Sequence, residues 1–372
     1  MTASWHILHT ESSLGWGGQE LRILTESLGM IQRGHRVTLL CPEEATLFRE
    51  AQKRGLPVLA TPIARKNLSG LRALRKRLQA LRPEVIITHS STDSWLTALA
   101  TRWMDHPPAL IRLRHISAAV PVNPANRWLY GSASRLVITT GAGIRERLIQ
   151  VNGIPASQVR SIPTGIDLTR FRPNDRLDAR IALGLPAQRP IVGIVATLRS
   201  WKGHHDLLDA FAGLNHPDAL LVIVGDGPRE AFLQERITRL GLSAERVRMV
   251  GRQENVPEWL AALDLFVLPS LANEGVPQAL IQAMATGLAI LSTPIGGIPE
   301  MIASGVSGML VPPGDVPALR AAMAQLLGDP EGRQRLGEAA LNVARTRCSL
   351  EIMLDRMEEA IRQVVQEPFL PR

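Results

Sequence analysis

The chain has 372 residues, with 42 Lys and Arg against 34 Asp and Glu, a formal net charge of +8 at pH 7 and only 4% aromatic residues. This length predicts two domains, because one hydrophobic core rarely serves so many residues. The scarcity of aromatic rings argues against a nucleic-acid partner bound by stacking. Two cysteines exclude a disulfide scaffold, and the sequence shows neither a signal peptide nor a membrane span, so we expect a cytoplasmic protein.

The charge is unevenly distributed along the chain. Residues 1–170 contain 22 Lys and Arg against 11 Asp and Glu, whereas residues 171–372 contain 20 against 23. A basic first half suggests an anionic partner. A predicted helix over residues 68–81 carries a leucine stripe among Arg and Lys, so it could lie peripherally on an anionic membrane. The alternative is an ordinary amphipathic helix whose leucines pack on a sheet.

The first half begins with a predicted strand that ends at His9, a glycine turn, a helix that ends near Gly34, and a second strand. Gly17 and Gly18 lie in the turn, where the backbone can approach a ligand. The pattern is not GxGxxG, and a tight turn needed only for backbone geometry would look the same.

Two later strands of the first half are each followed by a histidine, His89 and His115. Open α/β sheets bind ligands at the carboxyl ends of their strands, so both are candidates, and His115 is the stronger. A buried structural role is the alternative for each. Residues 136–139 are predicted to form the last strand of this half, and the turn-rich segment that ends at Asp167 is predicted to be the domain boundary.

The second half opens with an apolar strand over residues 191–196, and its loop contains Arg199 and Lys202. An arginine, whose planar guanidinium can donate two hydrogen bonds, beside a lysine ammonium at a strand-to-helix turn is typical of a phosphate site. A solvated surface pair is the alternative.

Residues 271–300 carry the strongest pattern in the chain. A polar loop with Glu274 and Gly275 precedes Pro277, which suits the first turn of a helix. An apolar helix face follows, Gly287 ends the helix, and a buried strand comes next. Helix N-termini attract phosphate, so we expect this one to bind a pyrophosphate group.

The motif Glu274-Gly275-x-Pro277, with Gln282 on the following helix, resembles the signature of retaining GT-B glycosyltransferases of family 4, and the resemblance extends over nearly the whole chain. It implies an α/β fold with two Rossmann-like domains whose parallel sheets face a deep cleft. Residues 1–167 would bind the acceptor and residues 168–349 the nucleotide sugar, while the helix within 350–372 would cross back to the first domain.

The same resemblance implies roles for individual residues. Glu274, Lys202, Arg199 and His115 would be the catalytic residues: Glu274 contacts the donor sugar, Lys202 and Arg199 hold the diphosphate, and His115 lines the sugar pocket. The binding residues would be Gly17, Gly18, Gly251, Gly275, Val276, Pro277 and Gln282. The chain departs from the family pattern where Gln282 replaces a ribose-binding Glu, and where Thr197 replaces the Arg that usually precedes Lys202.

The resulting prediction is transfer of a sugar from a nucleotide-diphosphate-sugar donor to a glycan or glycolipid, with retention, in bacterial surface polysaccharide or lipopolysaccharide assembly. No metal ion or cofactor is expected, because the chain has no Asp-x-Asp motif. Two alternatives stay open: a nucleotide-sugar 2-epimerase of the same fold, and a catalytically silent nucleotide-sugar binding protein.

Overall fold

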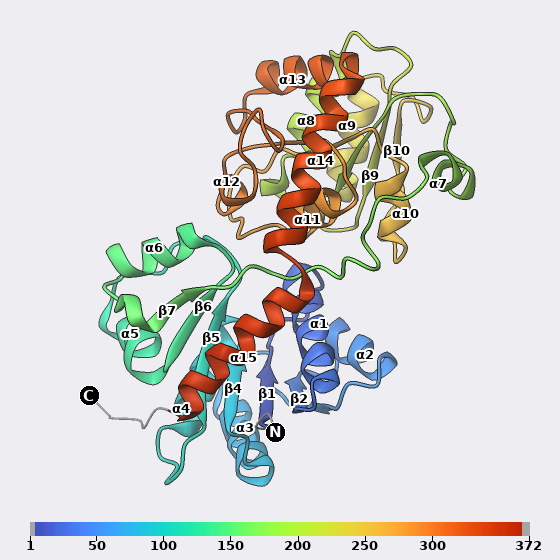
Figure 1. Ribbon diagram of the computed structural model, residues 1–372. Helices are drawn as coiled ribbons and strands as arrows, with labels where there is room; N and C mark the ends of the chain where they lie inside the picture. Colours follow the sequence, from blue (N-terminus) through green and yellow to red (C-terminus); the bar gives the residue numbers. More distant parts are fainter. Residues whose placement is uncertain (1–3, 367–372) are drawn as a thin grey trace. The chain divides into compact units, whose positions relative to one another are not determined.

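The computed structural model describes residues 4–366, which fall into two compact units (Figure 1). Unit 1 lies within Met1–Gly165 and Leu350–Arg372, and unit 2 is Ile166–Ser349. Each unit is built on one sheet in which every strand pair is parallel. The chain therefore has the α/β architecture of two Rossmann-like halves that the sequence predicts.

Unit 1 contains a seven-stranded sheet in the order β3-β2-β1-β4-β5-β6-β7. Its strands, in chain order, are β1 (His6–Thr10), β2 (Arg36–Cys41), β3 (Val58–Ala60), β4 (Val85–Thr88), β5 (Ala109–Arg114), β6 (Leu136–Thr139) and β7 (Val159–Ser161). The prediction that residues 136–139 form the last strand is wrong, because β7 pairs with β6. A strand of three residues inside a turn-rich segment is too short to show an apolar period.

The strands of unit 1 send alternate side chains to opposite faces of the sheet, as the two-residue period of a strand requires. Ile7, Val85 and Ile87 join one core with α1 (Gly18–Gln32), α2 (Thr46–Lys53) and α15 (Leu350–Gln366). Leu8 and Ile86 join the other core. That core also packs against α3 (Leu68–Leu81), α4 (Ser91–Thr101), α6 (Ala142–Gln150) and the π-helix Trp128–Ala133 that follows α5 (Pro124–Arg127).

The leucine stripe of α3 faces the protein interior. Leu74 and Leu78 are fully buried, and Leu71 and Leu81 pack against the same core. This agrees with the second of the two interpretations of the helix, in which the leucines pack on a sheet. Its apolar face is therefore not available to enter a lipid bilayer.

Helix α15 packs against α1 within unit 1, as Figure 1 shows. The guanidinium of Arg22 is fully buried between the two helices, where it pairs with Glu26 at 3.2 Å and donates to Ile162 O and to Met357 Sδ. On the surface, Arg33 pairs with Glu351 at 2.5 Å. These contacts attach the end of the chain to the first sheet.

Unit 2 contains a six-stranded sheet in the order β10-β9-β8-β11-β12-β13, with one continuous hydrophobic core. Its strands are β8 (Ile191–Val195), β9 (Leu220–Val224), β10 (Val247–Met249), β11 (Leu265–Leu268), β12 (Ile290–Ser292) and β13 (Met309–Leu310). Its helices are α7 (Arg176–Ala182), the 3-10 turn Ser200–Lys202, α8 (His204–Ala212), α9 (Glu230–Arg239), α10 (Val256–Ala261), α11 (Gln278–Ala285), α12 (Ile298–Met301), α13 (Val316–Gly328) and α14 (Pro330–Arg347).

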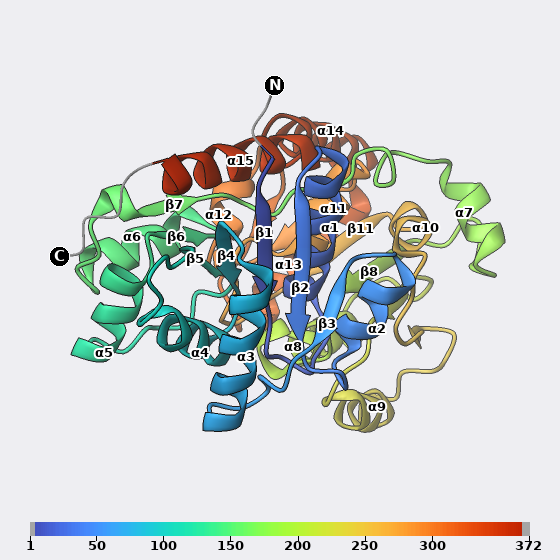
Figure 2. The ribbon, with the colours of Figure 1, turned by 90° about the horizontal axis from the view of Figure 1, so that it is seen from below.

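Each sheet is wound in two directions from its middle. The strand order reverses between β1 and β4 in unit 1 and between β8 and β11 in unit 2, and β1 and β2 are seen side by side in Figure 2. In open parallel sheets, ligands bind beyond the carboxyl ends of the strands at such a reversal. The fold therefore marks one edge position in each unit as a candidate site. Within residues 4–366, no helix has the length and apolar composition that crossing a bilayer requires.

Candidate active site

The loops that follow β8 and β11 meet at the reversal point of unit 2. Lys202 ends the 3-10 turn after β8, and Glu274 lies in the loop between β11 and α11. Lys202 Nζ is 2.7 Å from Glu274 Oε1, and Ser270 Oγ donates to the same oxygen at 2.6 Å. Two residues that are 72 positions apart, and that the sequence assigns to separate motifs, therefore form one ion pair.

Backbone contacts hold these loops in place. Leu271 N donates to Trp201 O at 2.7 Å, and Gly297 N donates to Gly275 O at 2.8 Å. Gly296 has a φ of +59°, and a Cβ on it would lie 2.0 Å from the carbonyl oxygen of Glu274. Only glycine tolerates both the left-handed backbone and this close approach. The position of Glu274 thus depends on the glycine turn after β12.

Helix α11 begins beside this ion pair. Its N-cap is Pro277, with no side-chain cap, so the N-cap residue leaves the first amides of the helix without a side-chain acceptor. The sequence places Pro277 inside the first turn, but the helix begins one residue later, at Gln278, because the proline has an extended ψ of 127°. Gly287 ends the helix as predicted, with a left-handed φ of +77°.

The other predicted residues of unit 2 lie at the same edge with different exposure. Val276 is buried and Gln282 is half-buried on α11. Arg199 is exposed, with its guanidinium 5.8 Å from the ring of Trp201, so it is not a partner of Glu274. Gly251 follows β10 with a φ of +66°, and its carbonyl oxygen accepts from Gly225 N at 2.8 Å.

In unit 1, the predicted residues lie at the reversal between β1 and β4 or next to it. Gly17 is the N-cap of α1 and Gly18 its first residue, again without a side-chain cap. His115 directly follows β5 and is half-buried. Its Nε2 lies 3.0 Å from Nδ1 of His89, and Nε2 of His89 lies 2.9 Å from Nδ1 of His9.

Buried acids surround the same edge of unit 1. Glu11 follows β1, accepts from Ser13 N at 2.7 Å, and is bonded to Gln19 Nε2. Burial, together with the nearby Asp93 carboxylate, raises the pKa of Glu11 to about 8. Neither Glu11 nor Asp93 was identified from the sequence. A polar residue directly after the first strand is the signal that could have found Glu11.

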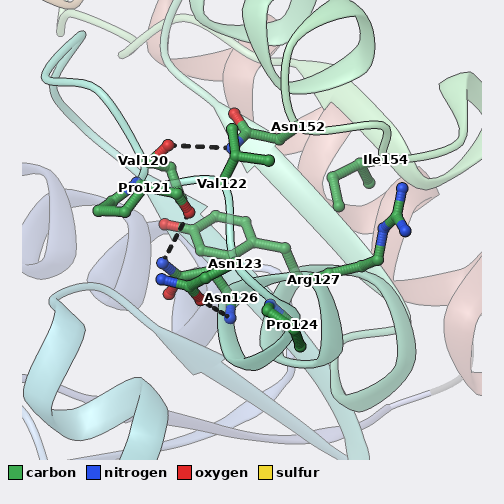
Figure 3. Close-up of a pocket in the computed structure, with 10 residues that line it drawn as sticks. Val120, Pro121, Val122, Asn123, Pro124, Asn126, Arg127, Asn152 and Ile154 are labelled. Carbon is green, nitrogen blue, oxygen red and sulfur yellow. Dashed lines mark hydrogen bonds between the residues drawn. The ribbon is translucent and has the colours of Figure 1, made fainter.

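A separate pocket of about 260 Å³ opens in unit 1 between α5 and the segment after α6 (Figure 3). Its amide side chains are already engaged within the chain: Asn126 Nδ2 donates to Pro121 O at 2.9 Å and Asn152 Nδ2 to Val120 O at 3.0 Å. None of the residues predicted to form the site lines this pocket.

Two family models match consecutive parts of the chain. Residues 16–170 match the model described as Glycosyltransferase Family 4, and residues 175–343 match the one described as Glycosyl transferases group 1. A D-inositol 3-phosphate glycosyltransferase of Nocardia farcinica is 28% identical over 369 residues, which cover 87% of this chain and 80% of the relative. The lipopolysaccharide core biosynthesis mannosyltransferase LpsB of Rhizobium meliloti is 36% identical over 193 residues, 49% of this chain and 54% of the relative.

Solved structures share the whole fold. A glycosyltransferase from Rickettsia africae superposes with a TM-score of 0.86 at 19% identity, covering 98% of this chain and all of the other. The Anabaena protein Alr3699/HepE, in complex with UDP-glucose, superposes with a TM-score of 0.85 at 22% identity, covering 96% of this chain and all of the other. The chain belongs to the family 4 glycosyltransferases of GT-B fold, and it is a transferase.

Proposed function

We propose that this enzyme transfers a sugar from a nucleotide-diphosphate-sugar donor to a glycan or glycolipid acceptor, and that unit 2 binds the donor. The observation that carries the proposal is the Lys202–Glu274 ion pair beside the first amides of α11, at the reversal point of the sheet. A diphosphate needs cations and amide donors, and a sugar needs hydroxyl acceptors. This edge of unit 2 offers both.

The roles follow from the chemistry of each group. Lys202, Arg199 and the first amides of α11 would offset the charge that develops on the departing diphosphate. Glu274 Oε2 has no protein partner in the part of the chain that the structure describes, so it is available to accept a hydrogen bond from a donor-sugar hydroxyl. Gln282 would contact the ribose through its amide, which can both donate and accept.

The transfer itself breaks the bond between the anomeric carbon and the donor phosphate oxygen. The acceptor hydroxyl oxygen forms the new bond to that carbon, and its proton leaves with the diphosphate. We propose that the anomeric configuration is retained, as the resemblance to the family signature implies. We assign no protein nucleophile to this step. For unit 1 we propose that the amides at Gly17 and Gly18 receive the diphosphate or the acceptor, and that His115 contacts the donor sugar or the acceptor.

The class of pathway is part of the proposal. The relative from Rhizobium meliloti, whose name refers to lipopolysaccharide core biosynthesis, favours a surface glycan as the product. The complex of the Anabaena protein with UDP-glucose favours a uridine nucleotide among the donors to test first. We propose surface polysaccharide or lipopolysaccharide assembly as the setting.

A nucleoside diphosphate panel tests the donor side without knowledge of the acceptor. A ligand that binds only the folded state raises the melting temperature by mass action, so one diphosphate should stand out. The matching nucleotide sugar is then incubated with and without glycan acceptors. A glycosylated product supports the proposal. An epimer formed without acceptor would show a 2-epimerase instead, and binding without any conversion would show a silent binding protein.

We also propose peripheral contact of unit 1 with an anionic membrane through the charges of α3 alone. Arg72, Lys76 and Arg82 are exposed, whereas the leucine stripe of the helix is buried or half-buried and Leu68 alone among the leucines of the helix is exposed. Such binding is electrostatic and must weaken with salt. Co-sedimentation with vesicles containing 30% phosphatidylglycerol should therefore exceed that with neutral vesicles and fall as salt rises. Equal sedimentation with both kinds of vesicle would contradict the proposal.

A further inference from the structure

Three histidines of unit 1, His9, His89 and His115, stand at the ends of three neighbouring strands. His9 lies in β1, His89 directly follows β4 and His115 directly follows β5, and these strands are adjacent in the order β1-β4-β5. His9 is completely buried and His89 is 3% exposed. The sequence places each of them at the end of a separate predicted strand, whereas the sheet brings all three into one row at its reversal point.

The rings of this row meet edge to edge. The ring centroids of His9 and His89 are 5.2 Å apart with planes inclined by 15°, and those of His89 and His115 are 5.3 Å apart at 29°. The facing nitrogens of each pair are 2.9 and 3.0 Å apart. Each centroid distance is longer than the matching nitrogen distance by about two ring radii, as it must be when both nitrogens lie on the line that joins the two centroids. The nitrogens therefore point at each other nearly in the ring planes, which is hydrogen-bond geometry and not face stacking. Because they face each other, they do not converge on a common metal position.

Burial disfavours the charged form of all three imidazoles. Burial, and then the Arg22 guanidinium, lowers the pKa of His9 to about 3. Burial also holds the pKa of both His89 and His115 well below the ordinary value, with Arg22 and Arg112 acting in the same direction. A neutral imidazole has one N–H and one lone pair, and a row of three such rings needs this pattern for each to donate to the next.

The ends of the row decide its direction. Nε2 of His9 is buried and has no hydrogen-bond partner in the described chain. The charged groups that lower the pKa of the row are cations: Arg22 from α1, and Arg112 and Arg114 from β5. The nearby acids are bonded to other groups: Glu26 pairs with Arg22, and Asp93 accepts from the backbone of His89 and from Thr10. A lone pair is favoured over an N–H in such a field. With Nε2 of His9 unprotonated, each ring must donate from Nδ1 to the Nε2 of the next.

We propose that His9 and His89 are positioning residues that hold His115 in the neutral tautomer with its proton on Nδ1, which leaves that N–H as a fixed donor for substrate. No protein group within residues 4–366 is bonded to Nδ1 of His115. The role toward substrate rests on the proposed function. In this state His115 is not a general base, because Nδ1 carries a proton and Nε2 is occupied.

A buried acid holds the backbone of the middle histidine. Asp93 Oδ2 accepts from His89 N at 2.9 Å and from Thr10 Oγ1 at 2.9 Å, and its Oδ1 accepts from Ser90 N at 2.9 Å. This capping box at the start of α4 ties β1 to the end of β4. The backbone of His89 is thereby set relative to His9, which keeps the row in register.

Long-range ¹H–¹⁵N correlation spectra of the full chain labelled with ¹⁵N-histidine test the proposal without any substrate. The His115→Asn spectrum assigns the His115 signals by their loss. We expect wild-type His115 at pH 7 to show protonated Nδ1 and unprotonated Nε2, the reverse of the tautomer that predominates for histidine in water. Protonated Nε2, or a doubly protonated ring, would overturn the proposal.

The His89→Leu variant removes the link, and His106→Leu, which changes an exposed histidine of the same unit, is the matched control. We expect His115 in His89→Leu to lose the fixed tautomer and to titrate closer to the ordinary pKa, with the control unchanged. His89→Asn should restore the tautomer in part, because its amide can donate where Nδ1 of His89 did. An unchanged tautomer in His89→Leu would also overturn the proposal.

Activity separates the positioning role from the proposed function. Wild-type kcat/KM should show no imidazole inflection between pH 5.5 and 8, whereas His89→Leu should fall about tenfold in kcat at pH 7 and gain an inflection near the ordinary histidine pKa. If the tautomer of His115 is as proposed but His115→Leu transfers sugar normally, the positioning role of His9 and His89 is supported and the role of His115 toward substrate is refuted. If the tautomer is wrong while transfer occurs, the proposed function stands and the row fails.

Discussion

Replacing Lys202 by Ala tests the diphosphate site at its most specific residue. Lys202 Nζ is 2.7 Å from Glu274 Oε1, and the side chain of Glu274 is only 5% exposed. Removing the ammonium leaves this carboxylate with the Ser270 hydroxyl as its remaining donor. Breaking a buried pair from one side costs about 3–5 kcal/mol of folding stability, so a loss of activity in this variant alone would be ambiguous.

A second substitution resolves the ambiguity. Glu274→Gln removes the charge that Lys202 would otherwise neutralise, and the double variant has neither charge. A nucleoside diphosphate lacks the donor sugar that Glu274 is proposed to contact, so Glu274→Gln alone should bind it normally. A charge-assisted bond contributes about 1.5–3 kcal/mol, so both Lys202→Ala and the double variant should bind it about 10- to 100-fold more weakly.

Isothermal titration with the best nucleoside diphosphate measures these affinities, and thermal unfolding measures the stability of each variant. The double variant should recover stability and stay weak in binding. Its turnover should be at least about 10²- to 10³-fold below that of wild type, because losing one donor to a developing anion alone has this cost. A double variant that binds as tightly as Glu274→Gln would refute the reasoning, because Lys202 would then serve only to neutralise Glu274.

Three further predictions follow from single contacts. The pKa of Glu11 is about 8 in the folded state against 4.5 in the unfolded state, so the free energy of unfolding of wild type falls by up to ~1.4 kcal/mol per pH unit between these values. In urea melts, Glu11→Gln should therefore be as stable as wild type near pH 4.5 and increasingly more stable toward pH 8. A stability difference that does not change with pH would contradict this. Gln282→Glu should keep or tighten donor affinity, measured by titration, and lost binding would remove Gln282 from the ribose site. Gly296→Ala places a Cβ 2.0 Å from Glu274 O, so it should lower both the melting temperature and the nucleotide affinity. Gly305→Ala is the control, because Gly305 also has a positive φ but a Cβ there meets nothing within 4 Å, and its effects should be far smaller. Equal effects of the two substitutions would show that the close approach is unimportant.

The sequence predicts the fold well because its strands are apolar and flanked by clear turn residues. The predicted bounds of α3 and β6 match the structure to the residue. It fails at β7 and at α7, because three- and seven-residue elements carry too few apolar positions to show a period. Helix α3 shows the further limit that an amphipathic pattern indicates a buried face without telling whether protein or lipid covers it.

The candidate site, like the fold, could be predicted from the sequence only in part. Lys202 and Glu274 could be identified because each lies in a local motif at a strand-to-helix loop. Their ion pair could not, since it depends on β8 and β11 being neighbours in the sheet. The same reason hides the contact of His9 with His89, because 80 residues separate them in the chain. Local chemistry is readable in sequence, whereas contacts between distant strands depend on the strand order.

The central claim is that unit 2 holds a diphosphate between Lys202 and the first amides of α11. A crystal structure of the enzyme with the nucleoside diphosphate that most raises its melting temperature tests this directly. We predict phosphate oxygens within hydrogen-bond distance of Lys202 Nζ and of the amides that follow Pro277. A diphosphate bound elsewhere, with Lys202 still bonded only to Glu274, would contradict the account.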